Sequence, residues 1–253
     1  MADIEKIIDN LNLPKQILDK SEALLKVLFG QSFDEVGGMI ADQVRLRRFK
    51  NQINIFTKAQ KILKDKKIDP KKVSLKVLAP LIEYSSYEEE ESIQGKWSHL
   101  TVYILENNSD VTFQQNCIAI LNKISSEEAI YLDTLYKRLE TRRIAFHQSR
   151  LEREKSLNIP PSDLQPNDFA LDIFTFNINE KHEIPRKRIE FMVSNLIALG
   201  LLKWETDVQV DANKSSDDPD DDSIDVDVTV DNNYYFIFSQ LGVKFVEVCR
   251  ETT

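Results

Sequence analysis

Residues 185–204, PRKRIEFMVSNLIALGLLKW, together with residues 234–250, YYFIFSQLGVKFVEVCR, decide the fold predicted for the second half of this 253-residue chain. Pro185 stands where a helix can begin, apolar residues then recur every three to four positions, and Gly200 ends the pattern. Strands are predicted at residues 201–210 and 233–239, and helical spacing returns at 240–250. The order helix, strand, loop, strand, helix predicts a winged-helix-like α+β unit with a short β-hairpin wing.

Upstream of this unit the sequence predicts helices almost throughout. Six glycines and eight prolines make up about 6% of the chain, whereas an ordinary protein contains about 12%, so the fold class is mainly α. The clearest amphipathic pattern covers residues 42–66, where an apolar stripe has a basic flank. Further helices are predicted at 4–29 as two short segments, at 73–85 with a kink or restart at Pro80, and between the break at 107–110 and residue 124.

Two capping boxes are predicted at helix starts. Ser86 with Glu89 would begin a helix whose buried stripe includes Trp97, and Ser125 with Glu128 would begin a helix that continues as a solvated extension to Pro160. A short strand is predicted at 171–178, where apolar and polar residues alternate. The predicted domains are a helical domain at 1–123, with basic and acidic helices, and a winged-helix-like domain at 124–253, with an acidic wing loop at 207–231.

Charge is concentrated in blocks along the chain. Residues 207–231 contain ten aspartates and one lysine, and residues 45–76 contain twelve lysines or arginines and two aspartates. Residues 83–91 contain five glutamates, and the formal net charge of the whole chain is −9. Because residues 214–223 contain no hydrophobic side chain, the wing loop is expected to be mobile and without a structural role.

No arrangement of residues in the sequence predicts catalysis, a metal site or a cofactor. His99, His147 and His182 have no neighbour at metal-ligand spacing, and no glycine-rich phosphate loop is present. Cys117 and Cys249 are far apart and predict two reduced thiols. Uncharged stretches reach only 12 residues, fewer than the roughly 20 of a membrane span, and no signal-peptide pattern follows Met1. The expectation is a cytoplasmic, non-enzymatic protein.

Three segments resemble the abortive infection alpha family, bacterial proteins associated with phage defence whose biochemical action is undefined. They are GGMIADQVRLRRFKNQINIFTKAQKIL at 37–63, PLIEYSSYEEEESIQGKWSHL at 80–100, and the pairing of NLIALGLL at 195–202 with YYFIFSQLGVKFVEVC at 234–249. The sequence departs from the family pattern after Trp97, at residues 101–103. The resemblance implies a role in defence and brings no catalytic residues. The family-motif residues are Asp42, Arg45, Arg48, Asn51, Glu83, Glu90 and Trp97.

Two hypotheses for function follow. In the first, the chain binds a protein partner or another copy of itself, and Arg48, Asn51, Glu83, Glu90 and Trp97 form one polar-rimmed contact between the basic and acidic helices. Arg45 and Arg48 would pair with glutamates of 83–91, because buried charge demands a partner. In the alternative, the surface Arg45–Lys76 binds nucleic acid, with phosphate contacts from Arg47, Lys50, Lys58 and Lys61. Sequence-specific reading by the 185–199 helix is disfavoured, because its outer face (Glu190, Ser194, Ala198) is poor in base-contacting residues.

Overall fold

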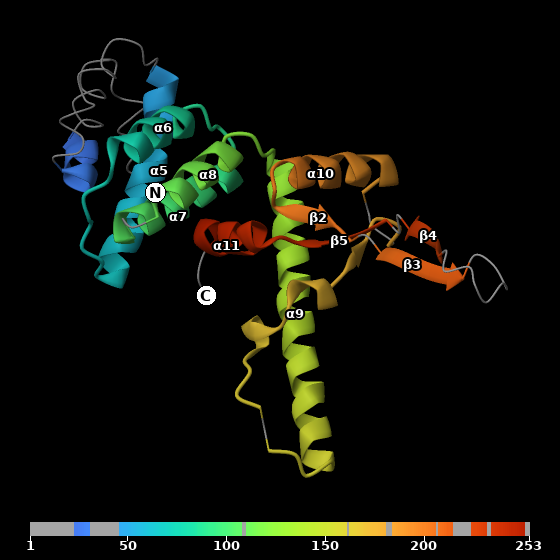
Figure 1. Cartoon of the computed structure of the whole chain (residues 1–253). Helices are drawn as coiled ribbons and strands as arrows, with labels where there is room; N and C mark the ends of the chain where they lie inside the picture. Colours follow the sequence, from blue (N-terminus) through green and yellow to red (C-terminus); the bar gives the residue numbers. More distant parts are fainter. Residues whose placement is uncertain are drawn as a thin grey trace. The chain divides into compact units, whose positions relative to one another are not determined.

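The computed structural model describes residues 23–30, 46–107, 110–160, 162–180, 184–205, 207–214, 224–231 and 234–250. The chain forms two compact units (Figure 1): unit 1 is Met1–Tyr131 with Phe245–Thr253, and unit 2 is Leu132–Lys244. The predicted boundary between residues 123 and 124 stays a prediction. The mainly α class is confirmed, with a small antiparallel sheet toward the carboxyl end. No helix within the described ranges is long and apolar enough to cross a membrane.

Unit 1 is a cluster of helices in which α5 packs on α7 and α6 packs on α8. Its helices are α5 (Leu46–Lys66), α6 (Leu75–Ser85), α7 (Glu91–Glu106) and α8 (Val111–Leu121), and residues 23–29 are also helical. Phe56 and Trp97 lie at the centre, with 0% and 1% of their surfaces exposed. Pro80 lies inside α6, as predicted. The predicted helical residues 4–22 and 42–45 lie outside the described part of the chain.

The first predicted capping box is wrong. The α7 helix begins at Glu91 with Glu90 at its N-cap, and no side chain caps it. Ser86 instead follows the last residue of α6, where its hydroxyl donates to the Glu83 carbonyl oxygen at 2.6 Å. A helix C-terminus has carbonyls to satisfy, and a serine hydroxyl can do so as readily as it accepts at an N-terminus.

The second capping box is confirmed at the start of α9 (Ser126–Ser156). The Glu128 backbone N–H donates to Ser125 Oγ at 3.2 Å, and the Ser125 N–H donates to Glu128 Oε2 at 2.9 Å. Near the other end, the Glu154 carboxylate accepts from the Ser162 N–H at 3.0 Å and from Arg150 Nε at 2.8 Å. These donors hold the pKa of Glu154 below its ordinary value. The chain after α9 therefore turns back along this helix, and the hydrogen bond from Ser162 to Glu154 holds the turn in place.

Most of the strand predicted at 171–178 is not extended. Short 3₁₀ turns occupy η1 (Pro166–Asp168) and η2 (Leu171–Ile173), and only β1 (Phe176–Asn177) is extended. Apolar residues face inward on both sides of η2, with Leu171 and Phe174 7% and 4% exposed. Leu171 and Phe174 are three residues apart, and a 3₁₀ turn places residues i and i+3 on the same side, so both side chains can be buried together.

The carboxy-terminal part of unit 2 follows the predicted order. After α10 (Arg186–Ala198) come Gly200, with a φ of +76°, and β2 (Leu202–Trp204); β5 (Tyr235–Phe238) leads into α11 (Gln240–Cys249). The three strands form an antiparallel sheet in the order β1-β5-β2. Gly242 packs so tightly that a Cβ there would lie 2.0 Å from the Leu201 carbonyl oxygen, so α11 approaches β2 through a position that only glycine fits.

The acidic segment 207–231 contains two strands, which corrects the prediction of a loop over the whole of it. The strands β3 (Asp207–Lys214) and β4 (Ile224–Asp231) form a separate two-stranded antiparallel sheet. Valines alternate with polar residues in both strands, and this β-pattern outweighs the repulsion between aspartates. Residues 215–223, which include the DDPDDD run, lie outside the described residues.

Candidate functional site

The family-motif residues of unit 1 meet around Ser86, at the junction of α6 and α7. Arg48 Nε donates to Ser86 Oγ at 2.9 Å, and Asn51 Nδ2 donates to the Ser86 carbonyl oxygen at 3.1 Å. Gln52 Nε2 donates to the carbonyl oxygen of Ile82 at 2.9 Å. Ser86 is 0% exposed, so this network holds the end of α6 against α5.

A second set of hydrogen bonds ties α5 to α7. Gln94 Nε2 donates to Asn51 Oδ1 at 3.5 Å and to the Glu88 carbonyl oxygen at 2.9 Å. The hydroxyl of Ser98, the residue that follows the buried Trp97, donates to the Ile55 carbonyl oxygen at 2.9 Å. Hydroxyl and amide side chains of α7 thus donate to backbone carbonyl oxygens of α5 and of the segment that precedes α7.

The predicted polar-rimmed contact is only partly assembled. Arg48 and Asn51 come together, and Trp97 is buried on the facing helix, whereas the side chains of Glu83 and Glu90 are exposed. The partners of Arg48 are the Ser86 hydroxyl and the ring of Tyr87, whose centroid lies 4.0 Å from Cζ, rather than a glutamate of 83–91. Asp42 and Arg45 lie outside the described residues.

The predicted nucleic-acid surface is largely exposed. Lys50 and Lys61 are exposed on α5, and Lys58 Nζ lies 3.3 Å from Glu91 Oε1, an exposed ion pair that contributes about 0–1 kcal/mol. The side chain of Arg47 lies outside the described part of the structure. Additional exposed lysines follow along the same stretch of chain, at Lys64, Lys67, Lys71 and Lys76. Burial raises the pKa of Glu88, on the acidic side of this region, above its ordinary value.

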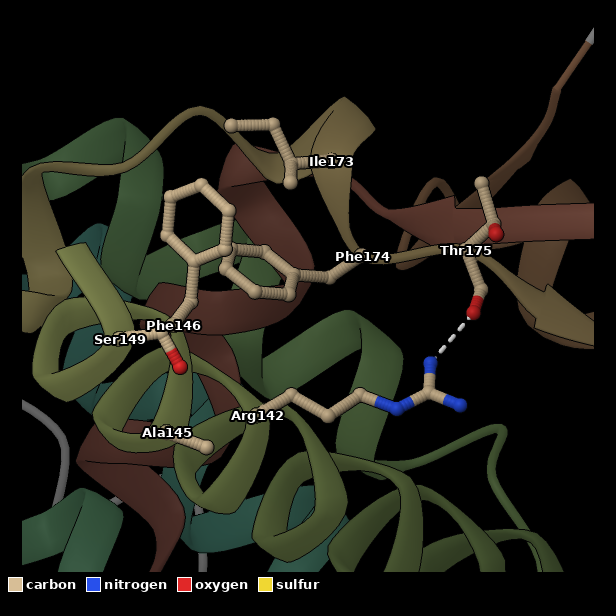
Figure 2. Close-up of a pocket in the computed structure, with 7 residues that line it drawn as sticks. All are labelled: Arg142, Ala145, Phe146, Ser149, Ile173, Phe174 and Thr175. Atoms are coloured by element: carbon tan, nitrogen blue, oxygen red, sulfur yellow. Dashed lines mark hydrogen bonds between the residues drawn. The ribbon is translucent and has the colours of Figure 1, made fainter. Parts of the chain in front are cut away.

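Unit 2 contains an open groove between α9 and η2 (Figure 2), which we call the α9–η2 groove. Its volume is about 410 Å³, and its lining consists of Arg142, Ala145, Phe146, Ser149, Ile173, Phe174 and Thr175. Phe146 packs edge-on against Phe174, with ring centroids 6.0 Å apart, and against Phe169 at 4.9 Å. Phe146 nevertheless remains 40% exposed, and Ile173, on the other side of the groove, remains 49% exposed. Two large apolar side chains are therefore held in place with much of their surface facing solvent.

Arg142 is the charged residue of the groove lining. Its Nη1 donates to the Thr175 carbonyl oxygen at 2.5 Å, as Figure 2 shows, and its guanidinium lies 5.0 Å from the ring centroid of Phe176. Its Nη2 is 3.8 Å from Glu180 Oε1, and Arg138 also pairs with that carboxylate. The guanidinium is thus fixed in orientation at the groove wall. A lining with one cation, two hydroxyls and two aromatic rings is suited to binding an apolar surface.

Sequence reasoning missed the groove. Phe146 belongs to the part of α9 predicted as a solvated extension, and Ile173 to the segment predicted as a strand. The available signal was that Ile144 and Phe146 are apolar residues on the largely polar second half of α9, and that residues 171–176 are more apolar than one strand face requires. Apolar residues of this kind indicate that a segment packs against something, but the sequence does not show which other segment it packs against.

Other candidate chemistry in the sequence is not gathered by the fold. Within the part of the chain that the structure describes, no group of three or more His, Cys, Asp or Glu residues is placed to hold a metal ion. Cys117 and Cys249 are buried, on α8 and α11, and are not joined in a disulfide. Those two thiols match the sequence prediction.

The chain was compared with known protein families, curated proteins and solved structures. A family model described as abortive infection alpha matches residues 41–249. The match includes most of the 37–63 segment and all of the other segments on which the resemblance rested. No curated protein and no solved structure matches.

Proposed function

The chain belongs to the abortive infection alpha family, and from this membership we propose that it is a non-enzymatic, cytoplasmic protein that acts in phage defence by binding a protein partner through the α9–η2 groove. The carrying observation is the exposure of Phe146 and Ile173, at 40% and 49%, on a surface whose backbone is held in place by hydrogen bonds. Ordered apolar patches rimmed by polar residues mark protein-binding surfaces.

We also propose that the second half of unit 2 is a winged-helix-like module used for protein interaction. The helix α10, the strand order β1-β5-β2 and the hairpin inserted between β2 and β5 support this assignment. On α10 the exposed residues include Phe191, which is 73% exposed, and Ser194 and Ala198. Beyond the exposed Arg186, Lys187 and Arg188 of its first turn, this face offers few of the side chains that contact base edges.

A defence assay with matched variants tests the proposed function. In cells that express the chain, phage plating is compared between wild type, Ile173→Asp and Ile159→Asp. The two isoleucines are 49% and 50% exposed, but only Ile173 lines the groove. Ile173→Asp is expected to abolish protection, whereas Ile159→Asp retains it at equal expression. Loss of protection in neither variant, or equally in both, would refute a role for the groove.

Nucleic-acid binding through the lysines of 50–76 is the second candidate function. The observation in its favour is the exposure of Lys50, Lys61 and Lys64 along α5. Phosphate contacts release counterions, so duplex affinity should fall steeply as salt rises. Binding of labelled duplex is measured between about 50 and 200 mM salt, a range over which several phosphate contacts cost orders of magnitude in affinity. Lys61→Glu with Lys64→Glu should lower that slope, and a wild-type chain that does not bind would eliminate this function.

A further inference from the structure

Arg143 on α9 is a buried cation with weak partners. Only 4% of its surface is exposed. Its Nη1 lies 3.5 Å from Asn167 Oδ1 and its Nη2 lies 3.5 Å from the Phe169 carbonyl oxygen, whereas ordinary N–H···O hydrogen bonds measure about 2.7–3.2 Å. Its Nε has no hydrogen-bond partner in the part of the chain that the structure describes. The guanidinium therefore keeps unused donors at a buried position.

Other guanidinium groups of α9 have the counter-ion that Arg143 lacks. Arg142 pairs with Glu180. The Nε of Arg150 lies 2.8 Å from Glu154 Oε1. Among the described residues no carboxylate pairs with Arg143, whose two acceptors are an amide and a backbone carbonyl. Because a buried charge without a counter-ion is strongly destabilising, the site favours the arrival of an anion.

The side chain that covers this guanidinium can move. Asn167 belongs to the 3₁₀ turn η1 and is exposed, so Arg143 lies one side chain below the surface. Exposed side chains change rotamer within nanoseconds. Rotation of the Asn167 amide would present Nδ2, a donor, in place of Oδ1. The adjacent Asp168 carboxylate is held by the Gln165 N–H at 2.7 Å. An anion that displaces the amide oxygen would thus meet donors from both Arg143 and Asn167.

This donor set suits a small oxyanion. A guanidinium presents its N–H groups in a planar fork that matches two oxygens of a phosphate, and such charge-assisted hydrogen bonds strengthen where the dielectric is low. The site adjoins the α9–η2 groove, because the ring of Phe169 packs against Phe146 with centroids 4.9 Å apart. Arg143 and Asn167 do not belong to the groove lining.

We propose that Arg143 and Asn167 form a binding site for one phosphate group, which enters as the Asn167 amide rotates outward and supplies the missing counter-ion. This site goes beyond the proposed function, because it is separate from the surface assigned to the protein partner. A single side chain covers the guanidinium, so the site admits one phosphate group, either the free ion or the end of a small phosphate monoester.

Isothermal titration of the full chain with sodium phosphate, from about 0.1 to 20 mM at constant pH and ionic strength, tests the proposal. The wild type is expected to bind one phosphate per chain, and its melting temperature should rise with phosphate because the ligand binds the folded chain. Glycerol 3-phosphate is titrated in parallel. Tighter binding than inorganic phosphate assigns the site to a phosphate monoester, and weaker binding assigns it to the free ion.

Two variants remove the site in different ways. Arg143→Met deletes the guanidinium and keeps an unbranched side chain. Asn167→Asp places a carboxylate beside the guanidinium and so supplies the counter-ion from within the chain. Each is expected to lower phosphate affinity by about tenfold or more. Asn167→Asp is also expected to raise the melting temperature in the absence of phosphate, because it pairs a buried charge.

Matched controls separate the site from general effects of charge. Arg153→Met removes an arginine from an exposed position of α9, and Gln148→Glu makes the same amide-to-carboxylate change at another exposed position of that helix. Both are expected to bind phosphate like wild type. Phosphate stabilises folded proteins even without a site, so the rise in melting temperature that counts is the part lost in Arg143→Met. Circular dichroism checks folding, and if Arg143→Met does not fold, Asn167→Asp and Gln148→Glu provide the comparison.

Three outcomes would overturn the proposal. They are a wild type without saturable phosphate binding, an Arg143→Met or Asn167→Asp variant that binds phosphate like wild type, and equal losses in Asn167→Asp and Gln148→Glu. Ile173→Asp, which alters the groove, is expected to bind phosphate normally, so failure of the phosphate site and failure of the partner-binding groove are distinguishable.

Discussion

Replacement of Trp97 by alanine is the most direct test of how unit 1 is held together. Trp97 lies on α7, next to the hydrogen bonds that tie this helix to α5, and is 1% exposed. The chain has one other tryptophan, Trp204 on β2, which is 42% exposed. The pair offers a comparison in which side-chain chemistry is the same and burial differs.

The expected magnitude follows from the buried area. An aromatic side chain buries about 150–250 Å², and at about 25 cal/mol per Å² this is about 4–6 kcal/mol. The alanine methyl retains part of that burial, so Trp97→Ala should cost about 3–5 kcal/mol. Trp204 meets Phe236 edge-on with centroids 6.5 Å apart. Trp204→Ala should cost about 2–3 kcal/mol, because 42% of its surface is already in water.

Urea unfolding measures both losses. Far-ultraviolet circular dichroism follows the helices, and the fluorescence of the remaining tryptophan reports one unit at a time: Trp204 for unit 2 in Trp97→Ala, and Trp97 for unit 1 in Trp204→Ala. The transition of unit 1 should move to clearly lower urea in Trp97→Ala. A loss below 1 kcal/mol, or equal losses in the two variants, would show that the ring of Trp97 does not anchor α7.

Three further predictions concern backbone approach, capping and pH. Gly242→Ala should destabilise the protein by about 1–3 kcal/mol or more, because the new Cβ would overlap the Leu201 carbonyl. Gly95→Ala on α7, where a Cβ meets nothing within 4 Å, should stabilise the protein by about 0.5–1 kcal/mol. The melting temperatures of the two variants and of the wild type measure both effects. Ser125→Ala removes the cap of α9 and should cost about 0.5–2 kcal/mol in urea. Because the folded pKa of Glu154 is lowered, its contribution is complete above the ordinary pKa of 4.5 and is lost as pH falls through the folded pKa. Glu154→Gln should therefore flatten the loss of melting temperature in acid, and an unchanged acid profile would contradict the assignment.

The helices of unit 1 could be predicted because their signals are local. The helical patterns of α5 and of α6, which continues through Pro80, can each be recognised from residues within a few turns of one another. Ser86 shows where such reasoning stops. Its neighbours fit an N-terminal capping box, yet tertiary contacts from Arg48 and Asn51 hold it at the C-terminus of α6. A capping residue has more than one way to satisfy its hydroxyl, and distant residues decide between them.

The β3–β4 hairpin could have been predicted from the alternation of apolar and polar residues in its strands, but the many aspartates led to the prediction of an acidic loop. Composition alone indicates a disordered acidic loop, but in residues 224–231 each aspartate or threonine follows an apolar residue. A period of two marks a strand even when one of its faces is fully charged. The groove could not be predicted in the same way, because Phe146 and Ile173 come from segments 27 residues apart in the sequence and meet only when the chain turns back along α9.

The hairpin also separates the two candidate functions by charge. A phosphate backbone brought against unit 2 would meet five aspartates in two paired strands, and each close like-charge pair costs about 1 kcal/mol even at high effective dielectric. Nucleic acid is therefore disfavoured beside the hairpin, and the candidate lysines lie in unit 1, whereas the exposed apolar residues of the α9–η2 groove lie in unit 2. Since the two surfaces belong to different units, a defence phenotype that follows Ile173→Asp but not Lys61→Glu with Lys64→Glu would assign the activity to protein binding. The converse pattern would assign it to nucleic acid.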